Sequence, residues 1–202
     1  LGDVYKRQEF KDRTIEAWTG GRDGKGVIHA TRTGYYIYKF IDPNLDLLQN
    51  RTSVHHWVIM RYAEILLSYA EAMNEAYGPT GNVGYRLNAV RALNQVRNRV
   101  GVEMPAVPTA ISKEELREKI RNERRVELAF EDHRFWDVRR WMIAPETLGA
   151  PLRGVEITKI SDEEFEYKPI EVEKRTFEPK MYLYPIPQAD LNTTGWVQNP
   201  LW

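Results

Sequence analysis

The sequence has 202 residues, of which 29 are basic and 29 acidic, so its formal net charge is zero. This balance, with no run of five or more like charges, disfavours a nucleic-acid-binding protein. Cysteine is absent, which excludes disulfides, thiolate metal sites and cysteine nucleophiles. No segment approaches the roughly 18 continuous apolar residues that a membrane-spanning helix needs. The length fits one domain or a small pair of domains.

The N-terminal segment is expected to be non-native. Leu1–Gln8 (LGDVYKRQ) matches nothing around it and resembles read-through from a vector, so residues 9–202 are expected to form the domain, as a fragment of a longer protein. Residues Glu9–Arg51 are rich in turn-forming residues, and the glycines of GGRDGKG lack the ending of a phosphate-binding loop. The pattern predicts irregular chain with one short strand at Tyr35–Phe40.

Two amphipathic helices follow in the sequence. Apolar side chains recur at helical spacing over Trp57–Tyr77, and the segment GPTGN provides a stop signal through its glycine and proline. A second stripe of apolar residues covers Leu87–Val100 and ends at Gly101. The short connection predicts an antiparallel helix pair of the tetratricopeptide type.

A third helix is predicted to begin at Ser112, because Ser112 and Glu115 form a capping-box pattern. This helix is expected to run into the charged segment that begins at Asn122. Turn residues then return, and the C-terminal part, Lys168–Trp202, predicts one or two short strands, including Met181–Tyr184. The expected fold is mainly α, with helix pairs, irregular loops and a few short β-strands.

The segment Asn122–Trp141, NERRVELAFEDHRFWDVRRW, contains five acidic residues, five arginines and no lysine. On a helical projection, Glu123 and Glu127 fall in the middle of the apolar stripe. Buried carboxylates need charged partners, and the forked guanidinium of arginine suits that role. The segment is therefore interpreted as a structural charge network, with ligand contact and catalysis as alternatives.

A glycoside hydrolase would use two carboxylates that flank the scissile bond, and Glu123 with Glu127 is the candidate pair. An i,i+4 spacing, however, places both carboxylates on the same face of a helix, so they cannot flank the bond. Nearby arginines would also lower the pKa values of both carboxylates, whereas a general acid needs a raised pKa. No catalytic residue is predicted.

No metal site and no cofactor are predicted. The histidines are His29, His55, His56 and His133, and none forms the i,i+4 pair of a zinc site. Asp42, Asn44 and Asp46 imitate the start of a calcium loop, but its glycine and its closing glutamate are missing.

Aromatic side chains in the predicted loops are the best candidates for ligand contact. Tryptophan and tyrosine offer large, rigid surfaces that can stack on the apolar faces of sugars. The alternative is that they pack the loops onto the helices. The candidates are Trp18, Tyr35, Tyr36 and Trp196.

Several phrases, in order, resemble the C-terminal part of the SusD/RagB family of outer-membrane nutrient-binding lipoproteins. They are RYAEILLSYAEAMNEAYG, LNAVRALNQVRNRVGV, ISKEELREKIRNERRVELAFEDHRFWDVRRW, YLYPIPQADL and the terminal QNPLW. The resemblance implies tetratricopeptide-like helix pairs covered by loops and short strands. It also implies that Glu123, Arg124, Glu127, Arg134, Asp137 and Arg140 match a motif that specifies the fold, with Asp132 where the family usually has glycine.

The resemblance further implies non-enzymatic capture of oligosaccharides, or in some cases peptides, at the cell surface. The captured ligand would pass to a TonB-dependent outer-membrane transporter, and the full-length protein would be lipid-anchored on the outer face of the outer membrane. Neither the signal peptide nor the lipid-anchor cysteine is found in this sequence. The alternatives are a helical-repeat scaffold that binds a peptide or protein and, least favoured, a glycoside hydrolase.

Overall fold

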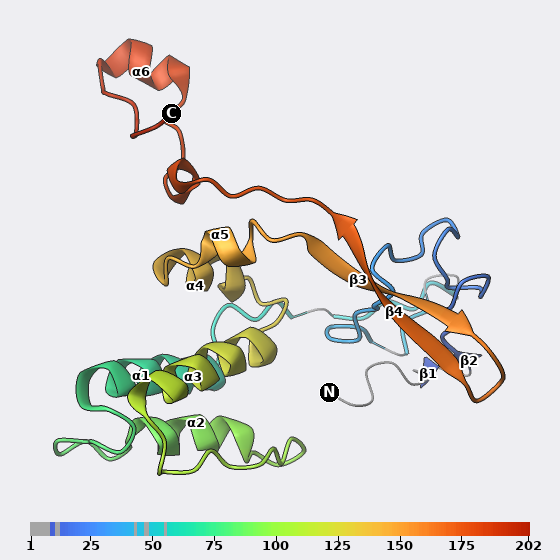
Figure 1. Cartoon of the computed structure of the whole chain (residues 1–202), viewed down its shortest axis with the longest axis horizontal. Coiled ribbons are helices and arrows are strands. Elements are labelled where there is room, and N and C mark those ends of the chain that lie inside the picture. The colour runs from blue at the N-terminus through green and yellow to red at the C-terminus, as the bar shows by residue number, and fades with distance from the viewer. Residues whose placement is uncertain (1–8, 11–12, 43, 47–48, 55) are drawn as a thin grey trace. The chain divides into compact units, whose positions relative to one another are not determined.

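The structure is a computed structural model, which describes residues 9–10, 13–42, 44–46, 49–54 and 56–202 (Figure 1). Leu1–Gln8, the predicted read-through, lies outside these residues. The chain divides into two compact units, His56–Asp137 and a second that combines Leu1–His55 with Val138–Trp202. The predicted mainly helical class is confirmed, because six α-helices and two small two-stranded sheets occur in the described chain.

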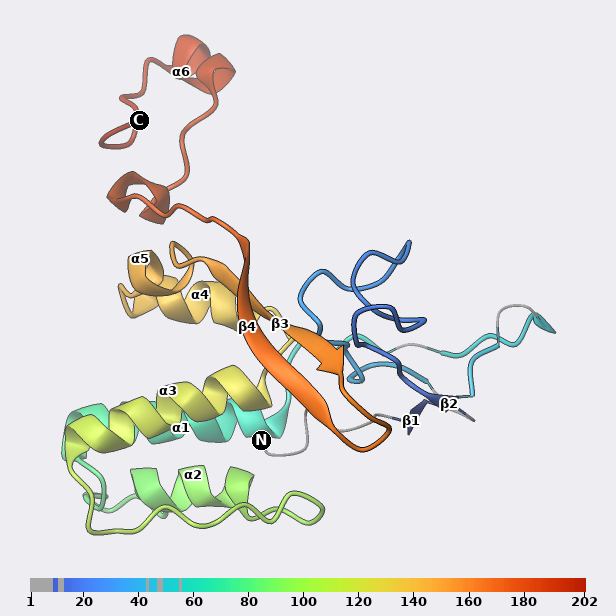
Figure 2. The same ribbon diagram turned by 45° about the vertical axis from the view of Figure 1, so that its right-hand side comes forward.

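The first unit is helical. It contains α1 (Tyr62–Tyr77), α2 (Ala89–Arg97) and α3 (Lys113–Glu127), and α1 packs against both other helices (Figure 2). Their apolar faces form one core, because each helix repeats its large apolar residues at helical spacing. The core includes Leu66, Leu67, Ala70, Leu93, Val96, Leu116, Ile120 and Leu128.

The helix ends follow the capping signals in the sequence. Gly78 ends α1 with a φ of 75°, a conformation that glycine adopts without steric cost. The capping box is confirmed, since the Glu115 N–H donates to Ser112 Oγ and the Ser112 N–H donates to Glu115 Oε2, both at 3.1 Å. Helix α1 begins later than predicted, because Arg61 is extended (φ −145°, ψ 161°).

The predicted third helix does run into the segment that begins at Asn122, but it does not continue through that segment. Helix α3 ends at Glu127, and a separate helix, α4 (His133–Arg140), begins after a turn. Phe130 and Asp132 in that turn have φ values of 63° and 64°, in the left-handed region that interrupts a right-handed helix.

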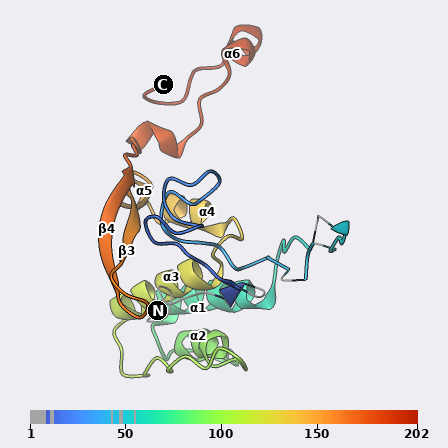
Figure 3. The same ribbon diagram turned by 90° about the vertical axis from the view of Figure 1, so that its right-hand side faces the viewer.

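The second unit contains the strands. Its main feature is the antiparallel hairpin of β3 (Leu152–Lys159) and β4 (Phe165–Glu173), which forms a twisted ribbon (Figure 3). A shorter pair joins β1 (Glu9–Phe10) to β2 (Arg13–Thr14). The remaining elements are short: α5 (Ala144–Thr147), the 3-10 helix η2 (Pro179–Tyr182) and α6 (Gln188–Thr194).

The strand predictions were mostly wrong in position. Tyr35–Phe40 is loop, and its neighbour Thr33 accepts a hydrogen bond at 2.8 Å from the backbone N–H of Val155 in β3. Gly154 permits this approach, since an added Cβ there would lie 2.6 Å from the Thr33 carbonyl oxygen. Met181–Tyr184 is not a strand but overlaps η2. In the described chain no helix combines the length and the hydrophobicity needed to cross a membrane.

Candidate functional site

The centre of the charge network is Arg61, which precedes α1. Its guanidinium donates to Glu131 Oε2 at 2.7 Å, to Glu131 Oε1 at 2.9 Å and to Glu127 Oε1 at 2.6 Å. Arg99 contacts the other oxygen of Glu127 at 2.8 Å. Burial alone would lower the pKa of Arg61, but the hydrogen bonds to Glu131 and Glu127 outweigh it and raise that pKa. Both carboxylates are therefore engaged by fixed cations.

Two further ion pairs join the helices of this unit. Arg97 donates to Glu123 at 2.5 Å. Arg124 donates through Nε to Asp137 at 2.8 Å and through Nη1 to Ser68 at 3.0 Å. The side chains of Arg124 and Asp137 are each only 5% exposed, so this pair is withdrawn from water. Because a lone buried charge is costly, each partner holds the other in place.

The turn between α3 and α4 explains how Glu131 becomes buried. Glu131 lies between Phe130 and Asp132, the two residues in the left-handed conformation. This double reversal directs the Glu131 side chain inward to Arg61, where it is 2% exposed. Aspartate is among the residues that tolerate this conformation, so Asp132 can replace the glycine usual in the resembling family.

The network does not have the arrangement of a two-carboxylate hydrolase. Glu123 and Glu127 project from a single helix, α3, and each is paired with an arginine from another part of the unit. The two carboxylates of such a hydrolase must flank the scissile bond, and two groups on one helix face do not. The arrangement favours helix-to-helix bonding over acid–base chemistry.

The arginines that complete the network could not be identified from the sequence. Arg61 lies 66 residues before Glu127, and Arg97 lies 26 residues before Glu123. The sequence signals that such partners must exist only through the two carboxylates, Glu123 and Glu127, that fall on an apolar stripe. Their identity depends on how the helices pack.

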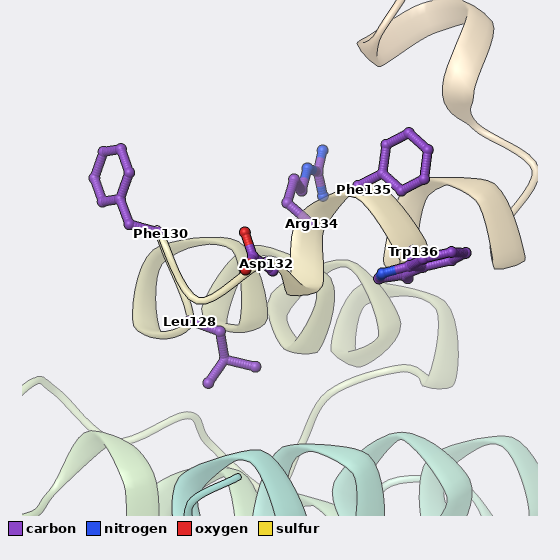
Figure 4. Close-up of a pocket in the computed structure, with 6 residues that line it drawn as sticks. All are labelled: Leu128, Phe130, Asp132, Arg134, Phe135 and Trp136. Carbon is purple, nitrogen blue, oxygen red and sulfur yellow. The ribbon is translucent and has the colours of Figure 1, made fainter. Parts of the chain in front are cut away.

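The two remaining arginines of the predicted network have different surroundings. Arg140 lies over the ring of Trp141, with its guanidinium carbon 4.7 Å from the ring centroid. Arg134 lines a pocket of about 540 Å³ within the first unit (Figure 4). The pocket is lined by Leu128, Phe130, Asp132, Arg134, Phe135 and Trp136.

Two of the aromatic ligand candidates make contacts within the second unit. The ring centroids of Trp18 and Phe165 lie 5.5 Å apart. The Lys159 ammonium lies over the Trp18 ring, 5.1 Å from the centroid of that ring. The Tyr36 hydroxyl donates to the carbonyl oxygen of Asp23 at 2.7 Å. The Trp18 side chain therefore packs its loop against the β3–β4 hairpin, and the Tyr36 side chain links two loop segments. Ligand contact by either remains a prediction.

The other two candidates are more accessible. Tyr35 is 38% exposed, next to the loop that pairs with β3, and Trp196 is 63% exposed, just after α6. Tyr35 and Trp196 belong to separate segments of the same unit. They stay candidates for ligand contact on the basis of exposure.

The terminal QNPLW segment folds back on the chain before it. The Gln198 side chain accepts from the Ile186 N–H at 2.8 Å and donates to its carbonyl at 2.9 Å. Asn199 donates to the Tyr184 carbonyl at 2.6 Å, and the Trp202 indole N–H lies 3.0 Å from two carbonyl oxygens. These hydrogen bonds join the terminal segment to residues 180–186.

Among the residues with described positions, no group of three or more histidine, aspartate or glutamate side chains is placed to hold an ion. The side chain of His133 lies 3.6 Å from Glu64, and His55 lies outside the described residues.

Comparison with known proteins identifies the fold family. A sequence profile of the SusD family matches residues 4–202. The chain belongs to the SusD family. Two curated relatives, both from Formosa agariphila, are SusD-like protein P2, 34% identical over 153 residues, and SusD-like protein P38, 35% identical over 104 residues. These alignments cover 73% and 48% of this chain, but 26% and 19% of the relatives.

A solved SusD-like structure supports the same assignment. The crystal structure of a SusD-like protein from Bacteroides fragilis matches 98% of this chain with a TM-score of 0.75 and 33% identity. This chain spans 37% of that protein. The SusD resemblance and the mainly helical fold predicted from the sequence are therefore confirmed. SusD-family proteins are non-catalytic binding proteins, which agrees with the prediction that no enzyme is present.

Proposed function

We propose that the chain belongs to a protein that captures oligosaccharides at the cell surface and delivers them to a TonB-dependent outer-membrane transporter. The observation that carries the proposal is the SusD-family match over residues 4–202. The family is associated with the outer surface of the outer membrane, so we extend that location to the full-length protein. Capture and release without covalent chemistry is consistent with the ion pairs that Glu123 and Glu127 make with arginines.

The aromatic candidates are the part of this chain that we assign to sugar contact. Tyr35 and Trp196 have accessible rings, while Trp18 and Tyr36 are held by neighbouring groups. Accessible rings can pack against the C–H faces of sugars, which carry partial positive charge, through the negative face of the π system. Rings that already pack against the protein contribute less new contact area.

The competing function is a helical-repeat scaffold with a peptide groove between α1 and α2. That groove is closed in the structure, because Leu66, Leu67 and Ala70 of α1 form one buried core with Leu93 and Val96 of α2. A peptide would have to enter elsewhere. No observation favours this function over sugar capture.

Calorimetric titration of the chain with neutral and acidic oligosaccharides and with peptides of equal length tests the proposal. We expect saturable binding of at least one oligosaccharide, weakened by Tyr35→Ala or Trp196→Ala but not by Tyr62→Ala. Tyr62 is the matched control, since it is 70% exposed and lies on α1. Saturable binding of peptide with no binding of any sugar would contradict sugar capture.

Delivery to a transporter needs a separate test. The full-length protein, tagged in its native cell, should co-purify with a TonB-dependent transporter after mild solubilisation of the outer membrane. Purification without any such transporter, while sugar binding persists, would remove the delivery step and leave the capture step standing.

A further inference from the structure

Two arginines near the α3–α4 turn lack the ion pairs that the other arginines of the network make. Across the described chain, no hydrogen bond or ion pair engages the guanidinium of Arg125 or of Arg134. Arg134 is half-buried, whereas Arg125 is exposed on α3. Burial and then the charge of Arg125 lower the pKa of Arg134, while Asp137 partly opposes them. Arg125 therefore acts on Arg134 as a like charge.

The pocket beside Arg134 has aromatic walls. Arg134, Phe135 and Trp136 come from α4, and Phe130 and Asp132 come from the turn before it (Figure 4). The rings of Phe135 and Trp136 are fixed edge to face, with centroids 5.1 Å apart. Phe130 and Trp136 are 57% and 60% exposed, large fractions for aromatic residues. The pocket volume of about 540 Å³ lies in the usual range for small-molecule sites, roughly 300–1,000 Å³.

The charges around this pocket do not cancel. Arg125 and Arg134 contribute two positive charges, and Asp132 contributes one negative charge. Asp137 is already engaged by Arg124 at 2.8 Å, so it is a poor counter-ion for Arg134. The site therefore has an excess positive charge next to an apolar aromatic surface.

We propose that this pocket binds an anionic sugar residue, whose carboxylate or sulfate contacts Arg134 while its ring packs on the aromatic wall. The proposal rests on the sugar-capture function proposed above and narrows its ligand class to acidic oligosaccharides. Arginine suits the contact, because its planar fork can donate two parallel hydrogen bonds to one carboxylate. Arg125 adds long-range attraction, and Asp132 can accept hydrogen bonds from sugar hydroxyls.

The test compares a trimer of galacturonate, a sulfated trisaccharide and neutral maltotriose by titration calorimetry at fixed ionic strength. We expect the 202-residue chain to prefer at least one acidic trimer to the neutral one by about tenfold or more, as a charge-assisted hydrogen bond allows. The two acidic ligands separate carboxylate from sulfate recognition. Raising the salt concentration should reduce the preference.

Substitutions show whether Arg134 provides this preference. Arg134→Ala should weaken acidic-trimer binding roughly tenfold to hundredfold and leave any neutral-trimer binding unchanged. Arg134→Lys keeps the charge without the fork and should retain part of the affinity, and it serves as the second variant if Arg134→Ala unfolds. Arg91→Ala on α2 removes one positive charge at an exposed arginine away from the pocket, and it is the control for the change in net charge.

The outcomes separate this inference from the proposed function. Equal binding of neutral and acidic trimers, or equal losses in Arg134→Ala and Arg91→Ala, would overturn the acidic site and leave sugar capture standing. A chain that binds no sugar of any kind contradicts sugar capture itself. A preference for acid that disappears only in the Arg134 variants supports the inference.

Discussion

The buried pair of Arg124 and Asp137 should be one of the most sensitive points of the helical unit. Asp137→Asn keeps the size of the side chain but removes its charge, and it leaves the Arg124 guanidinium buried without a counter-ion. Breaking one side of a buried ion pair costs about 3–5 kcal/mol. Both side chains are 5% exposed, so water cannot replace the lost partner. For a chain of this length the melting temperature should fall by roughly 6–20 °C.

Urea unfolding followed by far-ultraviolet circular dichroism measures the loss, because the helices provide the signal. Glu118→Gln is the matched control: Glu118 also pairs with an arginine, Arg121, at 3.1 Å, but it is 70% exposed. An exposed pair contributes at most about 1 kcal/mol, so this variant should unfold almost like the unsubstituted chain.

A double variant tests the reason for the loss. Arg124→Met with Asp137→Leu removes both charges and should recover most of the stability, to within about 1 kcal/mol, because no buried charge is left alone. A loss below about 1 kcal/mol in Asp137→Asn would refute the reasoning. So would a double variant as unstable as the single one.

Three further predictions concern caps, pH and the turn. Ser112→Ala removes the side-chain acceptor of the capping box and should lower the free energy of unfolding by about 1 kcal/mol. The same urea titration measures this loss. Thr109→Ala, outside the helix, should leave the free energy of unfolding unchanged. The pKa of Asp23 is lowered from 3.8 to about 2, chiefly by the hydrogen bond from Arg13. The contribution of Asp23 to stability is therefore present above pH 3.8 and is lost as the pH falls toward 2. In an acid titration, the stability of Asp23→Asn should decline less steeply than that of the unsubstituted chain, and an equally steep decline would contradict this role of Asp23. Asp132→Val should cost about 1–2 kcal/mol because β-branched residues avoid positive φ, whereas Asp132→Gly should be tolerated; thermal melts in which glycine is the worse substitution would contradict the role of that conformation.

Local signals were enough for the helices and their caps. The apolar stripes of α1 and α2, the glycine at the end of α1 and the capping box of α3 act over three or four residues, so the sequence predicts them. The β3–β4 hairpin was not predicted as a unit. Its strand β4 (FEYKPIEVE) alternates apolar and charged residues, but Pro169 in the middle argues against a strand. The turn after α3 was missed because Phe130 is not a residue that usually marks a left-handed conformation.

The sequence by itself determined that the chain is mainly helical, that it resembles the SusD family, and that Glu123 and Glu127 lie on an apolar face and need cationic partners. Helical periodicity and charge balance are properties of neighbouring residues, so they can be recognised without a fold. Only the tertiary structure decided that Arg97, Arg61 and Arg99 are those partners. It also decided that Arg134 faces an aromatic pocket instead of a carboxylate partner. Such pairings depend on which helices meet, and that is set by packing over distances of up to 66 residues along the chain.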